Sequence, residues 1–391
     1  MEGDFIKINK WLKPLSWLYG LAVGVRNQLF ELGILKSHSF DTPVIAVGNI
    51  TVGGSGKTPH VEHLIRLLQE QVKVAVLSRG YKRKSKGFVL ADSNTPMTKI
   101  GDEPFQMKQK FPNIYVAVDK NRCHGINTLI NNDDTKDTDV ILLDDAFQHR
   151  YVKPGINILL VDYHRLIIYD KLLPAGRLRE PQSGKNRADI VIITKCPDSL
   201  KAIDYRVLTK AMDLYPYQDL YFTRLDYCPL QPVFSQEPTA PEPTAQPTHH
   251  ALLLTGIASP EQLVMDMQGK YQSITPLSFA DHHRFSKKDV RKINKLYESL
   301  PEPKIIITTE KDATRLRDAQ GLSDEVRNNT YMLPIKIAFM LDQEPMFNQK
   351  IISYVHKNSR NSILVKGKDD HKPKDSNHSG NRPRTISFRN Y

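Results

Sequence analysis

A glycine-rich segment at residues 51–58 constrains the fold of this chain more than any other feature of its sequence. It reads Thr51-Val-Gly-Gly-Ser-Gly-Lys57-Thr58, directly after the apolar run Val44–Val47 and before a stretch with helical spacing at 59–71. This is the strand–loop–helix order of a P-loop, whose consensus is GxxxxGK[ST]; the segment departs from it only at the first glycine, which is Thr51. The segment therefore predicts a phosphate-binding loop in an α/β fold.

The residue types of this segment suit a triphosphate. Glycines let successive backbone N–H groups point at one phosphate chain, and the following helix directs its positive N-terminus at the same anion. Lys57 is placed to reach the β- and γ-phosphates, and the Thr58 hydroxyl to ligate Mg²⁺. The alternative, a glycine-rich turn with a chance lysine, fits the flanking strand and helix poorly. The predicted nucleotide-binding residues are Thr51, Val52, Gly53, Gly54, Ser55, Gly56, Lys57 and Thr58.

A second acidic anchor follows the apolar run Val140–Leu143, which ends in Asp144 and Asp145. Such a run resembles a Walker B strand, whose acid holds Mg²⁺ beside the P-loop threonine. The structural alternative for either aspartate is to cap a helix or a turn. Because the run occurs together with a P-loop, we interpret the pair as metal ligands.

Apolar runs alternate with helical stretches over residues 40–215, which predicts a mostly parallel sheet with helices on both faces. Further strand candidates and a smaller α/β block follow, interrupted by a Pro/Thr/Glu/Gln-rich segment that we interpret as a flexible insertion near 231–250. The last residues are polar and basic without apolar periodicity, which is typical of disorder. The predicted units are 1–39, an N-terminal helix; 40–215, a P-loop core; 216–356, a smaller C-terminal domain; and 357–391, a basic tail.

The first unit contains an apolar stretch, Trp11–Leu35, with helical spacing. Its uncharged part, Pro14–Val25, is shorter than the ~20 residues that a spanning helix needs. The start of the chain also lacks the basic region of a signal peptide. Two interpretations remain open from the periodicity alone: a helix packed on its own domain, and a helix lying on a membrane surface.

Phosphoryl transfer also needs a positioned acceptor hydroxyl, often with a base beside it. Asp102 and Glu103 lie in the turn Gly101–Pro104, where they either serve this chemistry or cap the following helix. Histidines at 282 and 283 follow Asp281; such a group serves as a base, as a metal site or as ordinary surface.

Other charged residues end apolar runs and are candidates for phosphate contacts or for structural ion pairs: Arg79, Arg177, Arg179 and Glu180. Lys195 lies in a partial match to the base-reading TKxD loop of GTPases, with Asp198 displaced by one position. We therefore infer no guanine specificity.

Charge and cysteine content limit the remaining classes. With 55 Lys and Arg against 43 Asp and Glu, the net charge of +12 predicts an anionic partner. Much of this surplus lies in the basic tail, which argues against nucleic-acid binding by the folded core. The three cysteines lie far apart, which argues against a disulfide framework and a cysteine-built zinc site.

These motifs, in this order, resemble those of the tetraacyldisaccharide 4′-kinase family of lipid A biosynthesis. The resemblance extends over about residues 10–340, and a P-loop that begins with threonine is the form that this family carries. The segments that carry it are Pro43–Pro59, Leu77–Tyr81, Gly101–Pro104, Leu143–His149, Leu173–Pro181, Phe279–Phe285 and Thr308–Asp312.

The resemblance implies an ATP-dependent kinase that phosphorylates the 4′-hydroxyl of a tetraacylated glucosamine disaccharide 1-phosphate. It implies a peripheral protein on the cytoplasmic face of the inner membrane, with the N-terminal helix on the membrane surface. Its partners would be the lipid A precursor and the membrane, without nucleic acid or an obligate protein partner. The residue roles carried over are catalysis for Lys57, Asp102 and His282, and Mg²⁺ binding for Thr58, Asp144, Asp145 and Glu103.

One alternative within nucleotide chemistry is a GTPase or ATPase that drives a partner protein, since the loop alone allows hydrolysis as well as transfer. The two hypotheses differ in the fate of the γ-phosphate, which appears on a glycolipid in one and as free phosphate in the other.

Overall fold

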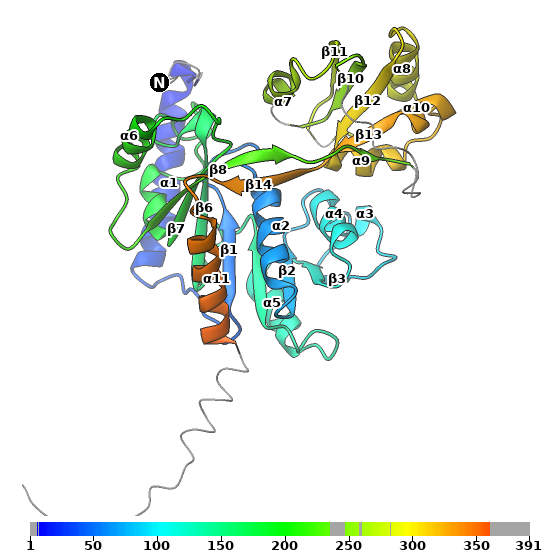
Figure 1. The fold of residues 1–391 in the computed structure, drawn as a ribbon. Helices are drawn as coiled ribbons and strands as arrows, with labels where there is room; N and C mark the ends of the chain where they lie inside the picture. Colours follow the sequence, from blue (N-terminus) through cyan, green and yellow to red (C-terminus); the bar gives the residue numbers. More distant parts are fainter. Residues whose placement is uncertain (1–5, 7, 235–246, 258–259, 282, 360–391) are drawn as a thin grey trace, which may run out of the picture.

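The computed structural model describes residues 6, 8–234, 247–257, 260–281 and 283–359. Among these residues, fourteen strands form two separate sheets, and helices cover both faces of the larger one (Figure 1). The predicted mostly parallel α/β architecture with a smaller C-terminal α/β block is thereby confirmed.

The larger sheet is parallel except at its two edge strands, β3 and β14, which run antiparallel to their neighbours. The P-loop strand β1 lies in its middle between β5 and β6. Across the sheet the order is β14 (Ile335–Phe339), β8 (Asp219–Tyr227), β7 (Ile190–Thr194), β6 (Ile156–Asp162), β1 (Val44–Gly48), β5 (Val140–Asp144), β2 (Val74–Ser78), β4 (Tyr115–Val118) and β3 (Val89–Ala91).

The second sheet belongs to the smaller unit and is parallel except for its short edge strand β9. Its order is β11 (Ser273–Ser278), β10 (His250–Thr255), β12 (Lys304–Thr309), β13 (Thr330–Leu333) and β9 (Gln231–Pro232).

The helices are α1 (Lys13–Glu31), α2 (Lys57–Leu68), α3 (Met97–Ile100), α4 (Asp102–Lys110), α5 (Arg122–Asn131), α6 (Ala202–Met212), α7 (Pro260–Met267), α8 (Lys287–Glu298), α9 (Glu310–Arg317), α10 (Asp324–Asn328) and α11 (Glu344–Asn358), with short 3₁₀ helices η2 (Lys10–Leu12), η3 (Tyr163–Arg165) and η4 (Gln182–Arg187).

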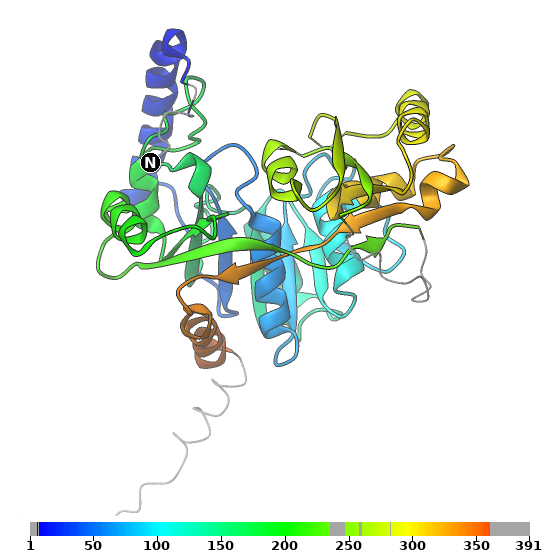
Figure 2. The ribbon, with the colours of Figure 1, turned by 45° about the horizontal axis from the view of Figure 1, so that its top comes forward.

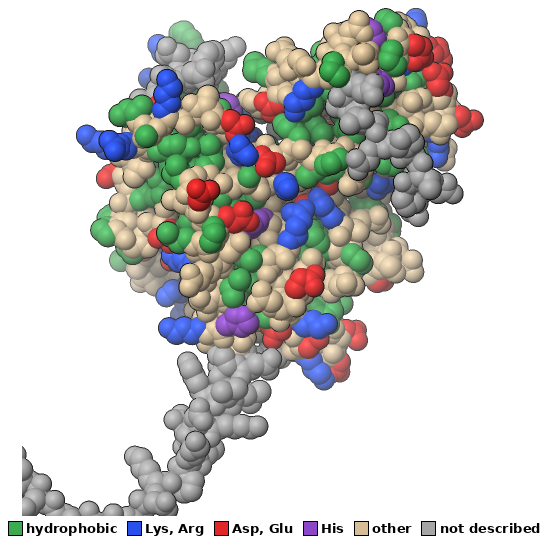
Figure 3. Space-filling model, viewed as in Figure 1, with side chains coloured by type: hydrophobic (Ala, Val, Ile, Leu, Met, Phe, Trp, Pro, Cys, Tyr) green, Lys and Arg blue, Asp and Glu red, His purple; other side chains and the backbone are tan. Residues whose placement is uncertain are grey.

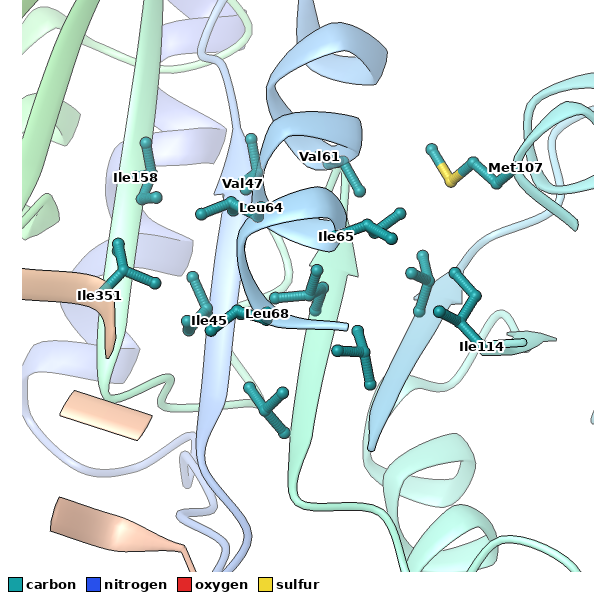
Figure 4. Close-up of a cluster of buried hydrophobic side chains, with 14 of the residues drawn as sticks. Ile45, Val47, Val61, Leu64, Ile65, Leu68, Met107, Ile114, Ile158 and Ile351 are labelled. Atoms are coloured by element: carbon teal, nitrogen blue, oxygen red, sulfur yellow. The ribbon is translucent and has the colours of Figure 1, made fainter. Parts of the chain in front are cut away.

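The apolar runs of the larger sheet are continuous because both faces of each strand are buried. On one face, Ile45 and Val47 of β1 pack against Leu64 and Ile65 of α2 and, farther along, against Ile351 of α11 (Figure 4). On the other face, the alternate positions of the same strands pack against α5 and α6. This double burial holds β1 and the start of α2 rigidly around the loop that joins them.

A two-stranded ribbon links the two units. Strand β8 pairs antiparallel with β14, with Tyr227 opposite Ile335 at its far end, and the chain continues directly into β9 and from β13. The ribbon runs from the larger sheet to the smaller unit (Figure 1). The predicted range 216–356 therefore contributes to both sheets. Its strands β8 and β14 belong to the larger sheet, and its helix α11 packs on that sheet.

Two predicted flexible segments are only partly covered by the structure. The ends of the range 231–250 form strand β9 and the first residue of β10, while 235–246 lie outside the described residues. Helix α11 continues to Asn358, and the tail from 360 onward likewise lies outside them.

Helix α1 packs along one side of the larger unit, and its first turns project beyond the rest of the molecule (Figure 2). Ser16 and Phe30 are buried, whereas Trp17 is 70% exposed, and Leu18 and Leu21 are more than half exposed. In the part of the chain that the structure describes, none of the helices combines the length and hydrophobicity needed to cross a bilayer.

Candidate active site

The glycine-rich segment forms the loop between β1 and α2. Gly56 adopts a left-handed backbone with φ of 80°, and α2 begins at the next residue, Lys57. The first turn of α2 therefore directs its unpaired N–H groups toward the loop, as an anion site requires. This is the geometry that the sequence predicts for residues 51–58.

The first position of the loop is a threonine whose backbone forms an isolated β-bridge with the segment at 177–179. Thr51 forms an antiparallel bridge with Leu178, Val52 N donates to Arg177 O at 2.8 Å, and Arg179 N donates to Ile50 O at 2.7 Å. An extended, β-branched residue suits such a bridge. The loop is thus anchored on one side to the segment that carries Arg177 and Arg179.

Residues at the ends of neighbouring strands hold the carbonyl groups of the loop. The Lys195 ammonium donates to Gly54 O and, at 2.6 Å, to Asp162 Oδ2, while Thr194 Oγ1 donates to Ser55 O at 3.0 Å. The carbonyl groups of Gly54 and Ser55 are thereby both held by hydrogen bonds from the end of β7. Lys195, which lies in only a partial match to a base-reading loop, therefore supports the phosphate loop.

The two aspartates after β5 have opposite environments. Asp144 is buried, and its pKa is raised to about 7 by burial and by the nearby carboxylates of Glu103 and Asp145. Burial alone also raises the pKa of Asp145, but Lys57 and Arg179 outweigh this effect and lower it below its usual value. Asp145 Oδ1 lies 3.5 Å from Lys57 Nζ.

The donor set around Asp144 fits Mg²⁺. Its Oδ1 is buried and accepts no hydrogen bond from any described residue, and the β1–β5 register places Asp144 opposite Val47, beside the loop. A hard cation satisfies such an oxygen. No three His, Cys, Asp or Glu side chains gather into a metal site among the described residues. In nucleotide sites Mg²⁺ binds through one or two carboxylates together with substrate phosphates.

Asp102 and Glu103 form the first turn of α4, but the N-cap of this helix is Gly101 and no side chain caps it, so the capping interpretation is not confirmed. Both also face the second unit. Arg315 of α9 donates through Nε to Asp102 Oδ2 at 2.9 Å, and Lys311 Nζ lies 3.5 Å from Glu103 Oε1. The two carboxylates therefore lie where the units meet.

Asp281 and His283, which are close in sequence, make different contacts. Asp281 lies 3.4 Å from Lys311 Nζ, near the same meeting point. His283 contacts Asp289 at 3.0 Å and stacks on Phe279, so it supports the N-terminal cap of α8. His282, the predicted partner of Asp102, lies outside the described residues.

Of the other charged residues that end apolar runs, some lie at the site and some form structural ion pairs. Arg179 Nη1 lies 3.5 Å from Asp145 Oδ2, at the site, whereas Glu180 is buried in a structural pair with Arg187 at 2.8 Å. Arg79 is exposed at the end of β2.

One pocket brings these elements together. It lies between the phosphate loop, the first turn of α4, the β8–β14 ribbon and the second unit, where charged side chains of both signs gather on the surface (Figure 3). Its lining includes Lys57 and Thr58 on one side and Asp281, Glu310 and Lys311 on the other. A molecule bound at the loop therefore contacts both units.

Residues 8–356 match the LpxK family model, tetraacyldisaccharide-1-P 4′-kinase. The chain belongs to this family. It is 59% identical over 363 residues to tetraacyldisaccharide 4′-kinase of Phocaeicola vulgatus, covering 93% of this chain and 99% of that protein. It is 52% identical to the protein of that name in Bacteroides thetaiotaomicron, covering 95% and 100%.

A solved LpxK structure from Aquifex aeolicus in complex with ATP matches with a TM-score of 0.66 and 28% identity. The match covers 88% of this chain and 98% of that one. The family resemblance inferred from the motifs is thereby confirmed.

Sequence reasoning missed the charged residues that join the units of this kinase. Lys110 of α4 contacts Glu62 at 2.7 Å and Glu310 at 2.6 Å, and Arg315 contacts Asp102. Of the missed residues, only Glu310 lies in a sequence motif, the one at 308–312. Lys110 and Arg315 lie outside every motif that carried the family resemblance.

Proposed function

We propose that this chain transfers the γ-phosphate of ATP to the 4′-hydroxyl of a tetraacylated glucosamine disaccharide 1-phosphate. The observation that carries the proposal is that the phosphate loop and Glu103 of α4 line one pocket between two units, with Asp102 next to Glu103 in the first turn of the helix. The family membership and the names of the relatives support the substrate class. The ATP in the Aquifex aeolicus complex supports the donor.

Within this proposal, the loop binds the triphosphate. The N–H groups of residues 51–58 surround the phosphates, and the Lys57 ammonium stabilises the negative charge that develops on the transferred group. Thr58, Asp144, Asp145 and Glu103 would hold Mg²⁺, which neutralises phosphate charge when bound. Arg179 keeps the Asp145 carboxylate oriented beside Lys57.

The acceptor side of the pocket belongs to α4. Asp102 lies at the start of this helix, near the second unit, where it is placed to orient the sugar hydroxyl and accept its proton. We propose His282 as its partner on the strength of the family motif alone.

Helix α1 supplies the contact with a lipid surface. Its exposed Trp17, Leu18 and Leu21, together with Trp11 of the preceding η2 helix, present apolar side chains beyond the body of the protein. Lys10 and Lys13 lie next to them. An amphipathic helix of this kind lies in the membrane interface with its cations among anionic headgroups. We therefore propose a peripheral position on the cytoplasmic face of the inner membrane.

The test is incubation with γ-labelled ATP and the purified disaccharide 1-phosphate in detergent micelles. We expect label on the glycolipid, and a product spectrum that places the phosphate at the 4′ position. Lys57→Ala should lower the rate by about two orders of magnitude or more, while Lys73→Ala, an exposed lysine next to β2, should not change it. A wild-type protein that releases only free phosphate would contradict the proposal.

A further inference from the structure

A buried arginine of the second unit reaches the proposed catalytic carboxylate of the first. Arg315 is 4% exposed and lies on α9, 213 positions after Asp102 in the sequence. Its Nε and Nη2 both donate to Oδ2 of Asp102. The guanidinium therefore fixes one oxygen of that carboxylate by two bonds.

The direction of this guanidinium is set by a buried carboxylate of its own helix, Asp312. Asp312 Oδ1 accepts from Arg315 Nη1 at 3.0 Å, and Asp312 Oδ2 accepts from Gly256 N and Thr309 Oγ1, both at 2.8 Å. Asp312 is fully buried and bonded to strand ends of its own unit. Arg315 is thus held in place by its own unit on one side while it holds Asp102 on the other.

Docking of the two units does not account for this arrangement. Other pairs already join α4 to α9, namely Lys110 with Glu310 at 2.6 Å and Lys311 with Glu103 at 3.5 Å. Burying a further arginine between two aspartates has a large desolvation cost, so a contact of this kind is weak evidence for a stabilising role. Its bonds to α4 are directed at Asp102, the residue proposed to act on the acceptor hydroxyl.

We propose that Arg315 is a positioning residue for phosphoryl transfer, acting through Asp102. This inference rests on the proposed function. Two bonds from a planar guanidinium restrict the rotation of the Asp102 carboxylate, which a single flexible ammonium does not achieve. The carboxylate keeps its direction toward the acceptor only while the two units are packed as they are here. Arg315 thereby makes the alignment of the reacting groups depend on that packing.

The experiment is a double-mutant cycle on the full-length chain, assayed with ATP and the disaccharide 1-phosphate in micelles. Arg315→Met should lower kcat by ~10²-fold, as small misplacements of reacting groups do, with the KM for ATP nearly unchanged. In the Asp102→Asn background the same change should cost less than about threefold, because a residue that acts through Asp102 has nothing left to position. Arg317→Met, an exposed arginine of the same helix, should match the wild type.

Arg315→Lys, which keeps the charge and loses the fork, should recover only part of the lost kcat. It also replaces Arg315→Met in the cycle if the methionine variant does not fold. Losses that multiply in the double variant, or an unchanged kcat in both Arg315 variants, would overturn the inference and leave the proposed function standing. A wild-type protein that does not phosphorylate the lipid would overturn both.

Discussion

His60 is a buried residue of α2 that contacts the phosphate loop on one side and strand β8 on the other. Its Nδ1 contacts Gly56 O at 2.7 Å, and its Nε2 contacts Thr223 Oγ1 at 3.1 Å. Because a carbonyl oxygen only accepts, Nδ1 carries the proton, and the neutral ring accepts from Thr223 on its other side. Burial lowers the pKa of His60 to about 4, which keeps the ring neutral at pH 7.

This pKa predicts a pH dependence of stability. The value of about 4 lies below the ordinary histidine value of 6.5, so the unfolded chain binds more protons between these limits. The free energy of unfolding therefore falls as the pH drops below about 6.5, and the loss is complete below about pH 4. The contribution of His60 is on the order of 3 kcal/mol.

His60→Gln removes the titrating ring and keeps a donor for Gly56. Denaturant unfolding between pH 4 and 7 should show a shallower decline for this variant than for the wild type. His356→Gln, on an exposed part of α11, is the control. Equal slopes for His60→Gln and the wild type would contradict the prediction.

The residues whose positions could be predicted from the sequence are those that neighbouring residues in the chain suffice to place. The loop residues 51–58 and Asp144 lie where their strand–loop patterns predict, because a strand end and a helix start suffice to place them. Arg315 and Lys110 could not be predicted, since their roles depend on partners some 200 positions away. His283 shows the converse, as its neighbours in sequence suggested chemistry and its contacts assign it to a helix cap.

At the level of elements, the parallel strands were predictable because burial on both faces leaves long apolar runs. Strand β14 and helix α9 were not, for physical reasons. Residues 335–339 of β14 pair with 223–227 of β8, more than a hundred positions earlier, and no local pattern signals that register. Helix α9 contains few apolar residues because its charged side chains face α4, where Glu310 contacts Lys110 and Arg315 contacts Asp102.

We predict that the exposed apolar side chains of helix α1 bind lipid. Leu18 and Leu21 are more than half exposed, so the double variant Leu18→Ser, Leu21→Ser should fold normally and bind anionic phospholipid vesicles at least ~10-fold more weakly. Vesicle sedimentation measures this. Met346→Ser, an equally exposed apolar residue on α11, is the control, and undiminished binding by the α1 variant would show that another surface contacts the lipid.

On the scale of the whole molecule, the pocket exists because two units with separate sheets are held together by a ribbon and by charge pairs. Glu62 of α2 is buried with 2% of its surface exposed and contacts both Lys110 and Arg66. Lys110 also contacts Glu310 of the second unit. One ammonium thus neutralises carboxylates from both units.

Lys110→Met should therefore destabilise the protein by about 3 kcal/mol, because it removes the ammonium shared by Glu310 and the buried Glu62 and leaves Glu62 with Arg66 alone. Denaturant unfolding measures the loss, and the smaller unit should become the more easily cleaved by protease. Lys136→Met, which breaks an exposed pair with Asp133, should have no measurable effect. A loss as small as that of the control would show that the pair does not hold the units together.

The central claim is that a triphosphate bound at the loop gives its terminal group to a sugar hydroxyl in the same pocket. Its most direct test is the stoichiometry of ADP formed to glycolipid phosphorylated, measured in one reaction with and without the disaccharide 1-phosphate. We predict one phosphate on the lipid for each ADP, and almost no ADP without lipid. ADP that accumulates at the same rate in both reactions, with unmodified lipid, would contradict the account.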